Sequence, residues 1–296
     1  MVYLEHVPVL AEEVVKYIVN NNSGIYVDAT AGSGGHATEI LKKLSSNGRM
    51  ILLDIDPQAV EYLKKKFADD NRVYIFNRSY TDIPEVLNET GLSEVNGVIF
   101  DLGVSTHQLY DGERGFSFMR NGPLDMRFSM SPNGISAYEV VNTYDEEILI
   151  NIFQTYGEEP YAEEVASAIV RHREIKPIET TAELAGIISS VIPSKYDLRK
   201  HPATRVFQAL RIYVNDEFSN IEKGIKSAVD VLARGGRLGV ITYHSLEDKL
   251  VKRIFSQLKR SGIVKLVKKH GVRPRWSEKK RNRKARSAIL RVVEKR

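Results

Sequence analysis

Three acidic residues stand where apolar stretches of the chain end. Asp28, Asp54 and Asp101 close short runs rich in valine, isoleucine and leucine that have the length of buried strands. Carboxyl ends of parallel strands meet at one edge of a sheet, where such sheets bind ligands. The spacing therefore predicts a crevice lined by carboxylates, which suits a ligand that carries positive charge.

A glycine-rich turn follows the first of these strands. Residues 25–40 predict a short strand, a turn with glycines at 32, 34 and 35, and then a helix. Glycines let the backbone approach a ligand closely, and the start of a helix offers unpaired N–H groups. This is where a nucleotide-like cofactor is usually held.

The identity of the cofactor is left open by this turn alone. Gly32, Gly34 and Ala37 satisfy the dinucleotide pattern G-x-G-x-x-G/A, and Asp54 lies about 20 residues further on. S-adenosylmethionine is favoured because Asp28 can face a ligand amine, two glycines are adjacent, and the sheet is predicted to end in a hairpin. Its sulfonium suits acids and an aromatic ring. NAD(P) or FAD stays as the alternative.

The elements that position these residues alternate between strand and helix, which predicts an α/β fold with a parallel sheet covered on both faces. The alternation stops after Ser105 and resumes near residue 201. We therefore predict a Rossmann-like sheet domain formed by residues 1–108 and 202–296, with a small helical domain, residues 109–201, inserted into it.

Helix boundaries are predicted from caps and apolar spacing. Three capping boxes are expected, namely Ser136 with Glu139, Thr143 with Glu146, and Thr180 with Glu183. Residues 201–234 are predicted to form one long helix that Gly235 and Gly236 end. A strand to residue 244, a basic helix over 245–260 and two final strands are expected to follow.

Composition excludes several classes of protein. The 296 residues contain no cysteine, which rules out disulfides, thiolate metal sites and a cysteine nucleophile. No metal site is predicted. No apolar run approaches the roughly 20 residues of a membrane span, and Glu5 and His6 precede any apolar run. We expect a cytoplasmic protein with no membrane partner.

The charge is distributed unevenly. Residues 249–296 contain 19 lysines and arginines and 2 glutamates, whereas the preceding residues contain 24 basic and 36 acidic side chains. An acidic body with a strongly basic end predicts a polyanionic partner. Arg273, Arg275 and Trp276 combine charge with an aromatic ring, which favours RNA. DNA is not expected, and a homodimer is compatible with the sequence.

Six blocks of the sequence carry a family resemblance, namely His6–Leu10, Asp28–His36, Asp101–Gln108, Gly112–Arg127, Thr242–Asp248 and Arg286–Arg291. Together they resemble the bacterial family of 16S ribosomal RNA cytosine-N4 methyltransferases, the RsmH or MraW family. The resemblance runs from about residue 5 to residue 293, and the sixteen residues 112–127 are its most specific block.

The resemblance implies a class I methyltransferase fold, S-adenosylmethionine as cofactor, and a cytidine of the decoding region, within the small subunit, as substrate. Asp54 is implied to hold the ribose and Tyr80 to flank the adenine. The full set of implied cofactor residues is Gly34, Gly35, His36, Asp54, Tyr80, Asp101 and Gln108.

Catalytic and RNA-binding residues are predicted from their chemistry. The exocyclic amine of cytosine is a poor nucleophile, so an acceptor for its proton helps the transfer. Asp101 is the first candidate, with Asp125 and His244 as lesser ones, and cofactor binding alone is the alternative for Asp101. Candidates for contact with RNA are Arg114, Phe116, Phe118, Arg120, Arg127, Arg273, Arg275 and Trp276.

Two other functions stay compatible with the sequence. One is a non-catalytic ribosome-assembly factor that binds RNA and keeps the fold. The other is a dinucleotide-dependent oxidoreductase. For the arginines and phenylalanines of residues 114–127, ion pairing and packing within the loop are the alternatives to a contact with RNA.

Overall fold

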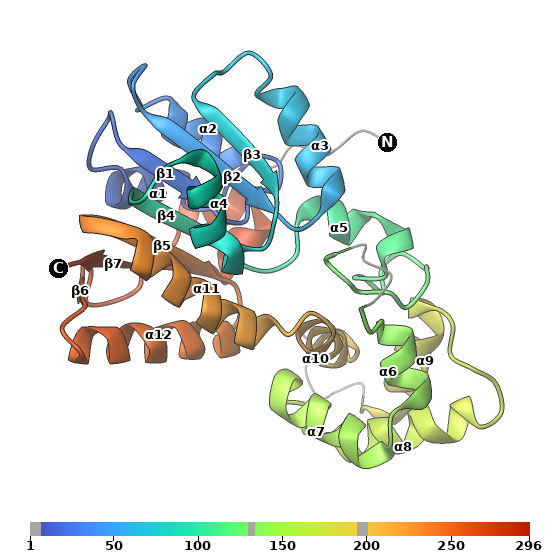
Figure 1. Ribbon diagram of the computed structural model, residues 1–296. Coiled ribbons are helices and arrows are strands. Elements are labelled where there is room, and N and C mark those ends of the chain that lie inside the picture. Colours follow the sequence, from blue (N-terminus) through green and yellow to red (C-terminus); the bar gives the residue numbers. More distant parts are fainter. Residues whose placement is uncertain (1–6, 130–133, 194–200) are drawn as a thin grey trace. The chain divides into compact units, whose positions relative to one another are not determined.

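The structure is a computed structural model that describes residues 7–129, 134–193 and 201–296. His6, at the start of the first sequence block, lies outside this part. The chain forms two compact units, one made of Met1–Gly103 and Phe218–Arg296 and the other of Val104–Glu217. The elements of both are labelled in Figure 1. The second unit is longer at both ends than the insertion predicted at 109–201.

The first unit contains a seven-stranded sheet in the order β3-β2-β1-β4-β5-β7-β6. All neighbours are parallel except β7, which runs antiparallel to both β5 and β6. The predicted Rossmann-like class I methyltransferase sheet, ending in a hairpin, is confirmed. The strands are β1 (Ile25–Asp28), β2 (Arg49–Asp54), β3 (Val73–Asn77), β4 (Val95–Asp101), β5 (Leu232–Thr242), β6 (Val264–Leu266) and β7 (Ile289–Lys295).

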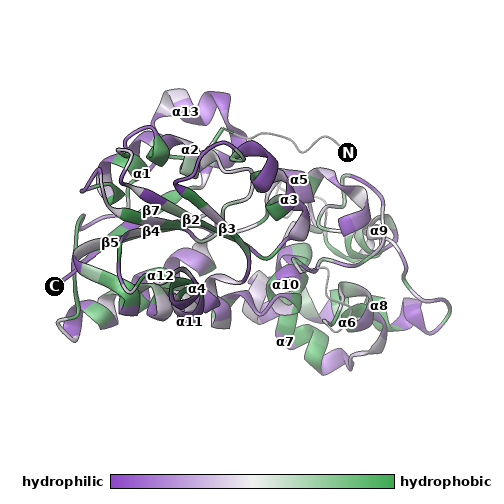
Figure 2. Ribbon diagram, turned by 45° about the horizontal axis from the view of Figure 1, so that its top comes forward, coloured by the Kyte–Doolittle hydropathy of each residue, from purple (hydrophilic) through white to green (hydrophobic). Residues whose placement is uncertain are grey.

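Helices cover both faces of this sheet. One face packs against α4, α11 and α12, and the other packs against α1, α2 and the segment around Ala285. Figure 2 shows these two layers on opposite sides of the strands. The helices of this unit are α1 (Ala11–Ile18), α2 (Gly35–Leu41), α3 (Pro57–Lys66), α4 (Ile83–Thr90), α11 (Glu217–Val231), α12 (Ser245–Arg260) and α13 (Trp276–Arg281), with 3₁₀ turns η1 (Tyr80–Asp82) and η3 (Arg283–Arg286).

The second unit is helical and has its own apolar core, as predicted for the insertion. Its core is built from Leu149, Ile152, Val165, Ile169 and Leu210, among others. The capping boxes predicted at Ser136 and Thr180 are both present. Its helices are α5 (Thr106–Tyr110), α6 (Ala137–Thr143), α7 (Glu146–Gly157), α8 (Ala162–Arg173), α9 (Thr181–Val191) and α10 (Thr204–Val214), with the 3₁₀ turn η2 (Gly112–Arg114).

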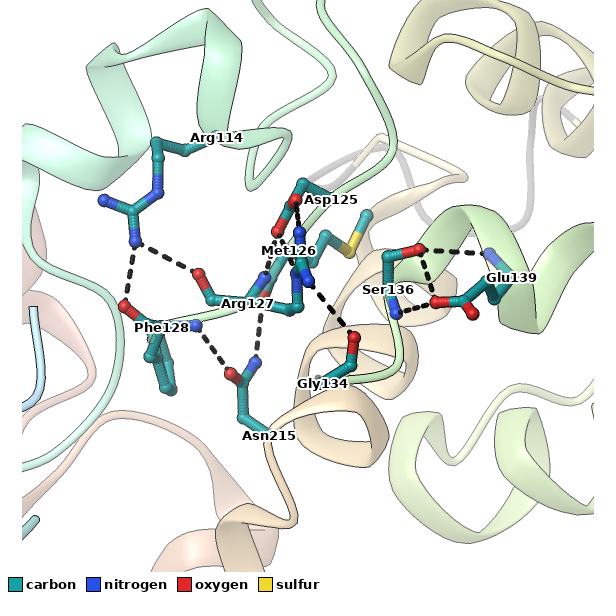
Figure 3. A network of polar contacts seen from close by, with 9 residues as sticks. All are labelled: Arg114, Asp125, Met126, Arg127, Phe128, Gly134, Ser136, Glu139 and Asn215. Carbon is teal, nitrogen blue, oxygen red and sulfur yellow. Dashed lines mark hydrogen bonds and ion pairs between the residues drawn. The ribbon is translucent and has the colours of Figure 1, made fainter. Parts of the chain in front are cut away.

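The prediction of one long helix over 201–234 is wrong. The chain breaks at Asn215 and Asp216, and Asp216 has a positive φ of 45°. The Asn215 side chain donates to the carbonyl of Met126 at 2.7 Å and accepts from the amide of Phe128 at 2.7 Å (Figure 3). These bonds to a distant loop fix the break, so α10 belongs to the second unit.

Two further boundaries differ from their predictions. Helix α11 ends at Val231, and the Gly235–Gly236 pair lies within β5, where the register against β4 shifts between Val95 and Gly97. The two glycines therefore lie at a β-bulge and do not end a helix. Thr143 is the last residue of α6, its hydroxyl donates to the Glu139 carbonyl, and Asp145 precedes α7 instead.

Within the part of the chain that the structure describes, no helix combines the length and the apolar character that a membrane crossing requires. The same residues contain no group of three histidine or acidic side chains arranged to hold a metal ion.

Candidate active site

Asp28 and Asp101 end neighbouring parallel strands at the carboxyl edge of the sheet. In the register of β1 against β4, Asp28 lies opposite Ile99. The Thr30 hydroxyl accepts a hydrogen bond of 2.6 Å from the Asp101 amide, which ties the two strand ends together. Burial raises the pKa of Asp28 to about 7, with His36 opposing and Asp101 adding to the rise. The strand ends thus bring acidic side chains together at one edge of the sheet.

The glycine turn is fixed by Asp54 at the end of β2. One carboxylate oxygen of Asp54 accepts from the Gly32 amide at 2.8 Å, and the other accepts from the Asp56 amide at 2.9 Å. Gly34 has φ +71°, and a Cβ there would stand 2.7 Å from the Phe67 ring. Gly34 is therefore required by the turn and by packing within the protein, whatever ligand the turn holds.

His36 lies in the first turn of α2 and is 5% exposed. Its Nε2 lies 3.4 Å from Oδ2 of Asp101, and neither ring nitrogen forms a well-directed hydrogen bond within the described structure. Burial lowers the pKa of His36, but the Asp101 and Asp28 carboxylates outweigh it, so the pKa lies above its ordinary value. The imidazole is placed to take up or release a proton as the local charge changes.

Tyr243, which the sequence analysis passed over, contacts Asp101 directly. Its hydroxyl donates a hydrogen bond of 2.6 Å to Oδ1 of Asp101. Burial raises the pKa of Tyr243 well above its ordinary value, and the Asp101 carboxylate adds to the effect. The sequence block 242–248 held this residue, but only His244 was singled out there.

His244 itself has a structural position. It is the N-cap of α12: its Nδ1 accepts from the Glu247 amide at 3.3 Å, and its Nε2 lies 2.9 Å from a Glu247 carboxylate oxygen. Glu247 is fully buried and also accepts from the Tyr243 amide at 2.7 Å. These contacts make His244 a part of the turn that carries Tyr243, and catalysis is not needed to explain its presence.

Lys284 in η3 is a second residue that sequence reasoning missed. Burial lowers the pKa of its ammonium to about 8, and the Asp101 carboxylate acts in the opposite direction. The segment around it is anchored because Glu278 accepts from the Leu10 amide at 2.7 Å and Ala285 is buried against the α1–α2 face. Lys284 belongs to the strongly basic end of the chain, where the local run of basic residues gives no sign that this side chain is half-buried.

The other predicted cofactor residues have defined packing roles as well. The Tyr80 ring lies edge-on to Phe100, with ring centroids 5.3 Å apart, and closely against Gly224 of α11. Gly35 packs against Pro8, which a Cβ would approach to 3.1 Å. Gln108 belongs to the second unit, where its side chain accepts from the Ser105 amide and completes the capping box of α5.

Asp125 and Arg127 form an ion pair within the second unit, with Arg127 Nη2 2.6 Å from Asp125 Oδ2 (Figure 3). Burial would raise the pKa of Asp125, but the hydrogen bonds from Arg127 outweigh it, and the pKa lies below its ordinary value. Arg127 also donates to the Gly134 carbonyl. The contacts match the alternative of ion pairing inside the loop.

The Arg114 side chain is 5% exposed, which favours a structural role over the predicted contact with RNA. Its guanidinium donates to the carbonyls of Arg127 and Phe128, at 3.0 and 2.9 Å (Figure 3). Phe116 is 7% exposed and stacks on Phe128 with ring centroids 5.3 Å apart, so it too is a packing residue. The sequence could not separate these roles because burial of a loop depends on distant partners.

Phe118 is half-buried and stacks on His201, with ring centroids 4.4 Å apart. Four of the predicted RNA contacts remain on the surface. Arg120 is exposed, and its guanidinium lies 5.2 Å from the centre of the Tyr110 ring. Trp276 is 75% exposed, and Arg273 and Arg275 are exposed beside it. These side chains are available to a partner.

Comparison with known proteins gives a match along nearly the whole chain. The model of the MraW methylase family matches residues 3–296. A protein of Coprothermobacter proteolyticus named ribosomal RNA small subunit methyltransferase H is 45% identical over 293 residues, which cover 99% of this chain and 97% of the relative. The protein of the same name from Elusimicrobium minutum is 48% identical, with 98% of each chain covered.

Proposed function

Since the chain belongs to the MraW methylase family, we propose that it transfers a methyl group from S-adenosylmethionine to the N4 amine of a cytidine in 16S ribosomal RNA. The relatives that match it over nearly their whole length are named as methyltransferases of small-subunit ribosomal RNA. The observation that carries the proposal is the cluster of Asp28, His36 and Asp101 beside the glycine turn.

The cluster fits the charge of the proposed cofactor. S-adenosylmethionine carries a sulfonium and an ammonium group, and Asp28 and Asp101 supply carboxylates for them at adjacent strand ends. Asp54 is fixed by two backbone amides and can still accept from ribose hydroxyls through its remaining lone pairs. A pyrophosphate would instead face Asp28 and Asp101, which disfavours the dinucleotide alternative.

The transfer is a direct displacement. The bond between the methyl carbon and sulfur breaks as the bond to N4 forms, the electron pair goes to sulfur, and N4 then loses a proton. Alignment contributes most of the rate in such a reaction. Asp101 Oδ2 is the proposed acceptor of the proton, since the carboxylate is 26% exposed and Oδ1 already accepts from Tyr243.

The base must leave its stack to reach the methyl group. Trp276 and the neighbouring arginines offer one exposed basic and aromatic surface for the flanking RNA, and Arg120 with Tyr110 offers another. Stacking on aromatic rings holds single-stranded bases with little dependence on sequence.

Radiolabelled S-adenosylmethionine tests the activity. Small subunits that lack the modification should accept label into 16S RNA at the N4 of one cytidine, and subunits that already carry it should not. Absence of label in the RNA, although the protein binds S-adenosylhomocysteine, would support the alternative of a non-catalytic assembly factor. A thermal shift with NADH but none with S-adenosylhomocysteine would support the alternative of a dinucleotide-dependent oxidoreductase.

The Asp101→Asn variant tests the proton acceptor. We expect turnover to fall about 10²- to 10⁴-fold, the usual contribution of a general base, while RNA binding persists. Asp69→Asn, at an exposed site on the same domain, is the matched control. Turnover within about threefold of wild type would remove Asp101 from the mechanism and leave it as a cofactor ligand.

A further inference from the structure

We infer that Tyr243 is a positioning residue for the proposed methyl transfer: its hydroxyl holds the Asp101 carboxylate in one orientation, so that Oδ2 is the oxygen that takes the amine proton. This inference rests on the proposed function. Tyr243 follows the last residue of β5, and Asp101 is the last residue of β4, which pairs with it. The two side chains meet at the carboxyl edge of the sheet.

The contact between them is short and held at both ends. The Tyr243 hydroxyl lies 2.6 Å from Asp101 Oδ1, within the range of a hydrogen bond to a charged acceptor. The Asp101 backbone is fixed because its amide donates to the Thr30 hydroxyl at 2.6 Å. The Tyr243 backbone is fixed because its amide donates to Glu247 at 2.7 Å. Both backbones are therefore anchored, and the two side chains extend towards each other from fixed positions.

The neighbouring backbone leaves room for the ring. Gly103 has φ +89°, and a Cβ there would lie 3.7 Å from Cδ2 of Tyr243 and 4.0 Å from a carboxylate oxygen of Glu247. The chain after β4 therefore passes beside the tyrosine. The ring is thus packed on one side by the backbone that follows β4.

Several charged groups face this pair, and they decide which partner keeps the proton. Burial raises the pKa of Tyr243 well above its ordinary value, and the carboxylates of Asp101, Glu247 and Glu278 act in the same direction. Tyr243 thus stays protonated throughout the working pH range and acts only as a donor. The other groups that face Asp101 are Asp28 on β1, His36 on α2 and Lys284 in η3.

The two carboxylate oxygens of Asp101 therefore have different roles. Oδ1 is held by the tyrosine, and Oδ2 lies on the side of His36, at 3.4 Å. When N4 releases its proton, the proton passes to Oδ2 and the tyrosine keeps its own. Tyr243 thus occupies Oδ1 and leaves Oδ2 as the oxygen that accepts.

The Tyr243→Phe variant removes only the hydroxyl. We expect kcat to fall about 10- to 100-fold, the usual effect of a lost hydrogen bond to a charged group, with binding of S-adenosylhomocysteine changed by less than about threefold. Tyr74→Phe, at an exposed tyrosine of β3, is the control.

A double-mutant cycle separates positioning from a general loss of structure. If Tyr243 acts through Asp101, adding Tyr243→Phe to Asp101→Asn should lower kcat no further. Additive losses would overturn the inference, and so would an unchanged kcat in the single variant. Absence of methylation by the wild-type protein would instead count against the proposed function, so the two failures are distinguishable.

Discussion

His36 Nε2 lies 3.4 Å from Asp101 Oδ2 at the carboxyl edge of the sheet, and the histidine is buried. Because the Asp101 and Asp28 carboxylates outweigh the burial, the pKa of His36 is raised. A cofactor that brings positive charge to this edge should lower that pKa again. We therefore expect His36, together with Asp28, to release protons when the cofactor binds.

Calorimetry can measure this release. Titration of the protein with S-adenosylmethionine in buffers of different ionisation enthalpy, near neutral pH, should show release of a fraction of a proton by the wild type and a smaller release by His36→Gln. His172→Gln, on α8 of the other unit, is the control. Equal release by wild type and His36→Gln would contradict the assignment.

Asp28 makes stability depend on pH. Its folded pKa of about 7 lies above the ordinary 3.8 because of burial, so its contribution to stability is present at low pH and is lost as the pH rises through about 7. Asp28→Asn keeps an acceptor for the Thr30 amide but does not ionise. The stability of the variant relative to wild type should increase from pH 4.5 to 8 and then level off.

The size of this gain is at most about 4 kcal/mol, from about 1.4 kcal/mol for each pH unit between the two pKa values. Urea unfolding of the cofactor-free protein at several pH values measures it. A difference between variant and wild type that stays constant with pH would show that Asp28 titrates normally.

Arg114 should matter for the stability of the helical unit and not for charge attraction to RNA. Arg114→Met leaves the carbonyls of Arg127 and Phe128 without this donor, which should cost about 1–3 kcal/mol in urea unfolding. Arg120→Met, at an exposed site, should leave stability nearly unchanged. A larger loss of stability in Arg120→Met than in Arg114→Met would contradict the structural role of Arg114.

Trp276 should contribute stacking rather than charge. Trp276→Ala should weaken binding of the small subunit by about 1–3 kcal/mol, the value for a stacked base, with no change in the salt dependence. Trp276→Phe should restore most of the affinity. Arg273→Gln should instead reduce the slope of log affinity against log salt by about 0.7. A salt slope altered by Trp276→Ala would argue against stacking.

The order of elements was predictable along most of the first unit. Apolar runs ending at Asp28, Asp54 and Asp101 give strands whose period and length depend on local sequence, and these strands form as expected. The break at Asn215 was not predictable, because it depends on hydrogen bonds to Met126 and Phe128. Helical spacing continues through this residue, so periodicity carries no sign of the break.

The sequence by itself determined which side chains reach the carboxyl edge of the sheet, since strand ends and a glycine turn are local features. The sequence also showed the resemblance to the methyltransferase family and the basic character of residues 249–296. Only the tertiary structure decided how these side chains pair. Tyr243 became the partner of Asp101, Lys284 became half-buried, and Arg114 became a loop support. Burial and hydrogen-bond partners come from residues far apart in the chain, and no local pattern encodes them.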